Sequence, residues 1–290
     1  MYFLVLASLV NVALDLLLII YVGMGVAGAA VATLISQLIS GIGCVIVMKK
    51  RFPILRMSPD EWKPDLKLMK NMLLTGVPMG LQFSITAIGS VIVQWSVNGL
   101  GVAAVAAVAA GSKLSMIFSC VFDALATTMA TYCGQNVGAG KIDRIPQGLR
   151  DCAIAGSVYC LAACAVIHLF DHQLLGLFVN AAEEPQVMAM ASHFIRMNSD
   201  FYIPLLLVNI VRLSVQGMGF TRAAMFAGVF EMIARTSVAL LLVPVMKFDG
   251  ACLANPAAWV MADAFLIPCF FHCLRTLRQR LQIPAKKHLY

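Results

Sequence analysis

Eight long apolar runs restrict what this chain can fold into more than any other feature of its sequence. They cover roughly residues 2–22, 26–48, 72–98, 102–133, 152–170, 186–216, 223–246 and 250–274. A helix needs about 20 mostly apolar residues to cross the hydrocarbon core of a bilayer. Charged side chains make up only 12% of the 290 residues, whereas a soluble domain carries about 25%. The sequence therefore predicts an all-α, polytopic bundle of eight transmembrane helices.

Basic residues gather at one set of connections between these runs. We place 17 of the 21 Lys and Arg residues there, including Arg212 in the turn between the sixth and seventh runs. Cytoplasmic connections carry the excess of Lys and Arg in membrane proteins. We therefore expect a multi-pass protein of the cell membrane, in contact with lipid, with both termini in the cytoplasm. The net charge of +7 then reflects these connections and not a nucleic-acid partner.

Residues 49–70 form the one long polar segment, and we interpret them as a cytoplasmic linker between two bundles. Ser58, Pro59 and Glu61 have the pattern of a helix start, which indicates a short helix on the membrane surface. Pro204 and Pro244 are expected kink sites in the sixth and seventh runs.

The stretch YCGQNVGAGKIDRI, residues 132–145, is close to a phosphate-binding loop. Gly140 and Lys141 fit the end of that motif, but Gln135 occupies the position of its first Gly. Ile142 follows the Lys, where the motif needs Ser or Thr. We interpret the stretch as a tight turn between two long helices.

Two short segments of small residues open the second and eighth runs. They are VAGAAVA, from Val26, and FDGACLA, from Phe248. Small residues let membrane helices approach closely, so we expect close helix contacts at both places.

Acidic residues inside the apolar runs are the first candidates for function, because a carboxylate in a membrane is costly. Asp123, Glu231 and Asp263 all lie about 12–17 Å from the cytoplasmic boundary at 1.5 Å per residue. They could line a cavity and take up protons or cations. The alternative for Glu231 is a local ion pair with Arg235, four residues later. The same spacing would pair Arg196 with Asp200.

Polar amides and methionines offer a second set of candidates. Gln82, Gln94 and Asn98 lie along the third run, where amides contact a ligand or hydrogen-bond a neighbouring helix. Met79 and Met116 suit an adaptable apolar cavity, since Met-rich surfaces accept varied shapes.

Cys160, Cys164 and His168 share one helical face at a spacing of four residues. Three ligands on one helix rarely enclose a metal ion without a further ligand from elsewhere. We therefore expect apolar packing there and no metal site or cofactor. No catalytic group of residues stands out, which argues against an enzyme.

Several segments, in order, resemble the multidrug and toxic compound extrusion (MATE) transporters, especially their bacterial branch. They are NVALDLLLIIYVGMGVAGAAVATLISQ, GVPMGLQFSITAIGSVIVQWSVNGLG, YCGQNVGAGKIDRI, RLSVQGMGFTRAAMFAGVFEMIAR and GACLANPAAWVMAD. The resemblance implies two six-helix lobes related by an axis along the membrane normal. Residues 1–48 are similar to the last two helices of the first lobe, and 49–70 to the inter-lobe linker. Residues 71–274 are similar to the complete second lobe, and 275–290 form a basic cytoplasmic tail. We thus expect a chain that lacks the family's first four helices, which a homodimer could compensate.

The resemblance implies antiport of organic cations or amphipathic drugs by alternating access, coupled to H⁺ or Na⁺. The sodium-driven branch binds its cation with acids on helices that match the third and sixth runs, yet the third run has no acid. The coupling ion therefore stays open. Three alternatives remain: a flippase for lipid-linked or polysaccharide substrates, a non-transporting truncated membrane protein, and a membrane-embedded enzyme.

Overall fold

The apolar runs form long helices. A computed structural model describes residues 2–52, 64–180 and 184–282. Within these ranges seven helices are long and apolar enough to cross a membrane, and a bent pair of helices supplies an eighth crossing. The three ranges contain no strand. The predicted all-α bundle is thereby confirmed.

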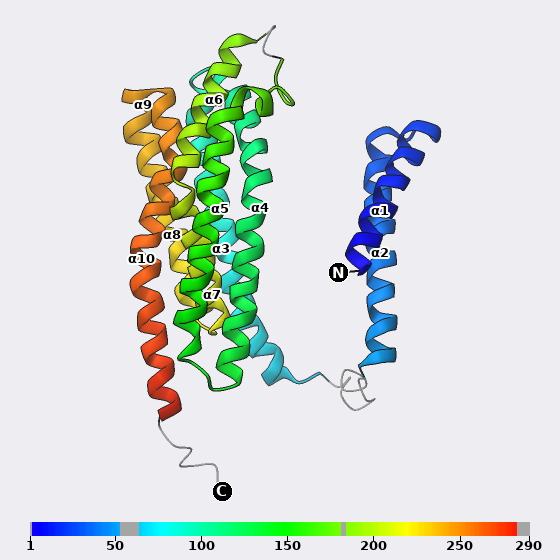
Figure 1. Cartoon of the computed structure of the whole chain (residues 1–290), viewed down its shortest axis with the longest axis vertical. Coiled ribbons are helices and arrows are strands. Elements are labelled where there is room, and N and C mark those ends of the chain that lie inside the picture. The colour runs from blue at the N-terminus through cyan, green and yellow to red at the C-terminus, as the bar shows by residue number, and fades with distance from the viewer. Residues whose placement is uncertain (1, 53–63, 181–183, 283–290) are drawn as a thin grey trace, which may run out of the picture. The chain divides into compact units, whose positions relative to one another are not determined.

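The chain divides into two units, Met1–Met69 and Lys70–Tyr290, which we describe separately. In the first, α1 (Tyr2–Leu16) continues into a π-helical turn, η1 (Leu17–Tyr21), and pairs with α2 (Gly25–Arg51) (Figure 1). The Ser40 hydroxyl donates to the Phe3 carbonyl at 3.2 Å. A Cβ on Gly28 would lie 3.2 Å from the Leu18 backbone. The small residues of VAGAAVA thus permit the close contact that their pattern predicted.

The second unit contains most of α3 and all the later helices, which Figure 1 shows as a bundle, and α7 lies among several of them. Its neighbours α4, α5, α8 and α10 all pack against it. In the core of this unit the Phe122 ring packs edge-to-face against the rings of Tyr159 and Tyr202, with centroids 5.6 and 5.5 Å away. The bounds are α3 (Leu66–Asn98), α4 (Val102–Gly138), α5 (Arg144–Leu175), α6 (Pro185–Asp200), α7 (Tyr202–Gly217), α8 (Thr221–Ser237), η4 (Val238–Leu242), α9 (Val243–Met246) and α10 (Phe248–Gln282).

Proline explains the break in the sixth span. Helices α6 and α7 meet at Phe201 with a bend of 54°. Pro204 has no N–H to bond the carbonyl of Asp200, and its ring would clash with that carbonyl in a continuous helix. Pro244 similarly follows a π-helical turn, η4. Both expected kink sites are therefore irregular.

The glycine-rich stretch at residues 132–145 is a turn between α4 and α5. Gly140 has φ +69°, a conformation that favours glycine. The Lys141 N–H donates to the Asn136 carbonyl at 2.8 Å, and the Tyr132 hydroxyl donates to the Arg144 carbonyl at 3.1 Å. The predicted tight turn is confirmed, and its flanking elements are helices, unlike the strand that a phosphate-binding loop follows.

FDGACLA also makes a close backbone contact, as predicted. A Cβ on Gly250 would lie 2.9 Å from the backbone of Leu242 and Val243. Gly250 and Gly28 hold the same position in the two small-residue segments. Each glycine therefore lets a helix pack against the end of the span before it.

The structure describes only the two ends of the predicted linker, residues 49–52 and 64–70. The surface helix predicted around Ser58–Glu61 lies outside the described residues. Helix α3 begins at Leu66, where the Asp65 carboxylate accepts the Lys67 N–H at 2.8 Å and caps the helix. The division into 1–48, 49–70, 71–274 and 275–290 stays a prediction.

Candidate functional site: a buried charge cluster

Glu231 lies in the interior of the second unit, between two arginines. Its side chain, on α8, is only 3% exposed. Arg212 of α7 donates a hydrogen bond to one carboxylate oxygen, Oε1, and Arg235 Nη1 lies 3.6 Å from the other, Oε2. The predicted i,i+4 pair with Arg235 is therefore present, but Arg212 makes the hydrogen-bonded contact.

Arg212 lies inside a helix, and its predicted place in a cytoplasmic turn is wrong. Helix α7 continues to Gly217, so Arg212 lies within the span, with its side chain 12% exposed. The turn comes later, at Met218–Phe220, where Gly219 has φ +91°. An apolar stretch can hold this arginine because Glu231 neutralises it from the next helix.

Asp263, on α10, is also buried and lies within electrostatic range of the Arg212 guanidinium. Its Oδ1 has no hydrogen-bond partner among the residues that the structure describes. Two arginines and two carboxylates can balance each other's charge, and Asp263 keeps an acceptor for a proton, a cation or water.

Helix α3 closes the cluster from another side. The Arg235 guanidinium donates to the Thr86 carbonyl at 3.4 Å. A Cβ on Gly89 would lie 3.2 Å from Met232, and one on Gly228 would lie 3.3 Å from Gln82. Glycine on both helices thus brings their backbones together and excludes bulk water from the charges.

The three predicted amides occupy different places. Gln82 is buried and accepts a hydrogen bond from Gln216 of α7 at 2.8 Å. Gln94 donates to Asn98 at 2.9 Å on their own helix. Gln82 therefore joins helices beside the cluster, whereas Gln94 and Asn98 line cavities elsewhere.

Asp123 lies apart from Glu231 and Asp263. Its side chain is on an exposed face of α4. It makes no ion pair with any residue in the described ranges. The structure thus brings two of the three predicted carboxylates together around Arg212 and leaves the third outside the cluster.

A polar cleft lies between α3, α4, α6 and α10. Two adjoining cavities of about 280 and 160 Å³ share Ser112, Phe194 and Asn255 in their walls. Gln94 lines the smaller cavity. Met116 and Trp259 form an apolar side of the larger cavity. Met116 is thus at a cavity, as predicted, while Met79 lines neither part of this cleft.

A larger cleft of about 820 Å³ opens near the C-terminal end of α3. Trp95 and Asn98 line it from α3, and Lys247 lines it from the turn before α10. It combines an aromatic surface with one positive charge, which suits a flat or anionic group.

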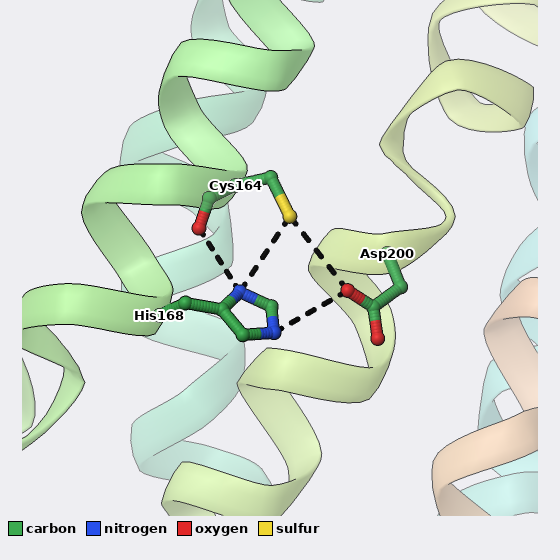
Figure 2. Close-up of side chains that lie close together, drawn as sticks. All are labelled: Cys164, His168 and Asp200. Atoms are coloured by element: carbon green, nitrogen blue, oxygen red, sulfur yellow. Dashed lines mark hydrogen bonds and ion pairs between the residues drawn. The ribbon is translucent and has the colours of Figure 1, made fainter.

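A third constellation joins α5 to the end of α6. Figure 2 shows Cys164 and His168 of α5 facing Asp200, the last residue of α6. The Cys164 thiol and the His168 Nε2 lie 3.6 and 3.4 Å from Asp200 Oδ1. Cys160 takes no part, because its thiol donates to the Tyr202 carbonyl.

The Arg196–Asp200 pair that the spacing suggested does not form. Arg196 instead binds Asp171 of α5 through two contacts, at 2.8 and 3.0 Å. Asp171 is buried and also accepts a hydrogen bond from Ser192. Both acids thus find partners on a neighbouring helix, which spacing within one helix cannot reveal.

Comparisons with known proteins agree on one family. The family model described as MatE matches residues 78–241. The chain is 30% identical over 213 residues to the probable multidrug resistance protein YpnP of Bacillus subtilis (strain 168), covering 72% of this chain and 46% of that protein. It is 24% identical over 230 residues to the multidrug export protein MepA of Staphylococcus saprophyticus, covering 77% of this chain and 50% of MepA. The chain thus spans about half the length of these curated relatives.

One more curated relative and two solved transporter structures are also similar to this chain. The FAD transporter of Shewanella oneidensis is 28% identical over 212 residues, covering 69% of this chain and 44% of its own length. An outward-facing multidrug resistance MATE family transporter superposes with a TM-score of 0.87 at 19% identity, covering 96% of this chain and 62% of its own. A MOP superfamily transporter from Pyrococcus furiosus gives 0.78, also at 19% identity, covering 99% and 63%.

Proposed function

The chain belongs to the MatE family, and we propose that it takes part in cation-coupled export of organic cations or amphipathic drugs across the cell membrane. The proposed mechanism is alternating access, in which a central cavity opens to one side at a time. The proposed driving ion is H⁺ or Na⁺, and the proposed orientation keeps both termini in the cytoplasm.

The buried cluster around Glu231 carries this proposal. A charged group in a membrane interior is expensive and marks ion pathways more often than packing sites. Glu231 holds arginines from its own helix and from α7. A proton or cation on this carboxylate would cancel its charge. Arg212 and Arg235 would then repel each other, with Asp263 left to balance them.

This change would act on the packing between helices. Helices α7 and α8 are joined by Arg212 and Glu231, and α10 carries Asp263 within electrostatic range of Arg212. Loss of the attraction would favour a different arrangement of the three. Ion binding and helix movement would thereby be coupled, as secondary transport requires.

The polar cleft offers a place for the drug. Asn255 donates to Asn198 at 3.4 Å across it, and the oxygens of such amides can accept from a cationic group. The Trp259 ring and the Met116 thioether supply an adaptable apolar wall. A positively charged aromatic compound would gain from both surfaces.

An anionic amphipathic solute is the second candidate. The cleft near Lys247 is larger and has a positive charge beside the Trp95 ring. One relative bears the name FAD transporter, and FAD combines a flat ring system with phosphates. This alternative predicts that Lys247→Gln weakens transport of the anion and leaves transport of an organic cation unchanged.

Drug accumulation in living cells tests the proposal. The chain would be expressed in bacteria that lack their own major drug exporters, and a fluorescent organic cation would be added. We expect lower accumulation than in empty-vector cells, and recovery of accumulation when a protonophore or sodium ionophore removes the gradient. Equal accumulation, with the chain shown to be folded and inserted, would contradict the proposal. Asn255→Trp, which fills the cleft, provides an expression-matched control.

A further inference from the structure

Cys164, His168 and Asp200 supply three different kinds of metal ligand at one point. Each can bring a sulfur, nitrogen or oxygen atom within 4.8 Å of the other two (Figure 2). Thiolate, imidazole and carboxylate are the ligands that Zn²⁺ takes in proteins. The constellation therefore has the composition of a zinc site with three protein ligands.

The distances suit ligands arranged around an ion. The separation of 3.4 Å between His168 Nε2 and Asp200 Oδ1 is longer than the 2.7–3.2 Å of an N–H···O hydrogen bond. Zinc bonds of about 2.0–2.3 Å in a tetrahedron place ligand atoms roughly 3.3–3.7 Å apart. Cys164 Sγ and Asp200 Oδ1, 3.6 Å apart, fall in the same range.

The His168 ring is oriented as in a metal ligand. Its Nδ1 lies 3.0 Å from the Cys164 carbonyl and 3.5 Å from the Cys164 Sγ. The carbonyl can only accept, so this contact favours the tautomer with a hydrogen on Nδ1. In the neutral ring Nε2 then has a lone pair, which faces a carboxylate oxygen that also only accepts. A proton on Nε2 or a metal ion between the two atoms relieves this opposition. Histidine ligands commonly donate their other N–H to a backbone carbonyl in this way.

We propose that Cys164, His168 Nε2 and Asp200 bind a Zn²⁺-class divalent ion, with a fourth position open to water or to another ligand. The Cys164 thiol loses its proton to solvent when the ion binds. The groups are reachable, because the His168 and Asp200 side chains are 39% and 53% exposed. This site is separate from the Glu231 cluster and does not depend on the transport proposed above.

The position of the site predicts what the ion would do. Asp200 is the last residue of α6, directly before the bend at Phe201. Cys164 and His168 both belong to α5. A bound ion would therefore cross-link α5 to the joint between α6 and α7. It would stabilise the bend against straightening.

Cobalt provides a spectroscopic probe, because Co²⁺ replaces Zn²⁺ in such sites and is coloured when four-coordinate with a thiolate. Co²⁺ would be added to the purified, reduced, full-length chain in detergent after treatment with a chelator. We expect one equivalent to give thiolate charge-transfer and visible bands that Zn²⁺ abolishes. The variants Cys164→Ser, His168→Gln and Asp200→Asn should each weaken binding on the order of tenfold or more.

Matched variants test where the ion binds. Cys160→Ser removes a thiol from the same face of α5. The double variant Cys269→Ser/Cys273→Ser removes the other close thiol pair, whose sulfurs lie 3.9 Å apart. Both should retain the bands. The proposal is overturned if no band forms, if Cys164→Ser leaves the bands intact, or if they depend on the Cys269–Cys273 pair.

Alkylation of the unaltered chain gives a readout that needs no variant. Zn²⁺ should slow modification of Cys164 by a maleimide at least severalfold, measured by peptide mass spectrometry. The exposed thiols of Cys44 and Cys120 should react at unchanged rates. Equal rates at Cys164 with and without Zn²⁺ would show a plain imidazolium–carboxylate contact and overturn the proposal.

Discussion

Arg212 of α7 donates a hydrogen bond to Glu231 of α8 inside the second unit, and both side chains are largely shielded from solvent. Two charges leave water in this arrangement, so their mutual attraction must offset a large desolvation cost. Such a pair is stable while both partners are charged and is sensitive to the loss of either charge. That sensitivity makes the pair a candidate switch.

Glu231→Gln should abolish gradient-driven transport and destabilise the fold. The substitution keeps the shape but leaves two buried arginines facing one remaining acid, Asp263. Breaking a buried pair in this way costs about 3–5 kcal/mol. Thermal unfolding in detergent should show the loss, and the conservative Glu231→Asp should recover part of it. Unaltered transport by a folded Glu231→Gln protein would remove Glu231 from the mechanism.

Neutralising both partners should cost less than the two single changes suggest. The double variant Arg212→Gln/Glu231→Gln leaves no charge stranded between them, so it should be at least about 1 kcal/mol more stable than additivity predicts. The exposed pair Arg278–Asp143, at 2.8 Å, is the matched control, with an expected coupling of roughly 0–1 kcal/mol. Equal coupling in the two pairs would show that burial does not strengthen the Arg212–Glu231 contact.

Glycine at position 250 should be required for packing. In Gly250→Ala the new Cβ would lie 2.9 Å from backbone atoms of Leu242 and Val243, and backbone cannot move aside cheaply. We expect a loss of about 1–3 kcal/mol. Gly80→Ala on α3 is the control, because its Cβ meets nothing within 4 Å, and alanine there should be neutral or stabilising by up to about 1 kcal/mol. The opposite order of stability would refute the close contact.

Asn255→Leu should impair drug recognition and spare the fold. It removes an amide from the shared wall of the polar cleft and keeps the branching and the number of side-chain heavy atoms. We expect the apparent affinity for an organic cation to fall roughly tenfold, a binding loss of about 1.4 kcal/mol. Binding of a fluorescent cation to the purified chain measures this directly. Unchanged affinity would exclude this cleft as the binding site, and Val91→Ala, on an exposed position of α3, serves as the comparison.

Periodicity and length were sufficient to predict the helices, because an apolar run of membrane-spanning length has few other structures available. Pro204 likewise indicated the bend at Phe201. The contacts between helices were harder. Arg212 was assigned to a turn because it is charged and because local sequence does not reveal its partner, Glu231 on α8. Its position inside the apolar stretch VNIVRLSV was the available signal.

The group of Cys164, His168 and Asp200 in Figure 2 was also only partly predictable from the sequence. The spacing of Cys164 and His168 predicted that they share a face, and this is observed. Asp200 comes from a different helix, α6, which ends there directly before the bend at Phe201. Spacing within one element can place ligands on a face, but the tertiary fold decides which other element completes the site.

Solute uptake into proteoliposomes that contain only this chain tests cation-coupled transport most directly. A fluorescent organic cation would be supplied outside, with a proton gradient in one experiment and a sodium gradient in another. We predict uptake that follows one of the two gradients and is lost in Glu231→Gln. No uptake under either gradient by folded, inserted protein, or equal uptake by the two proteins, would contradict export coupled through Glu231.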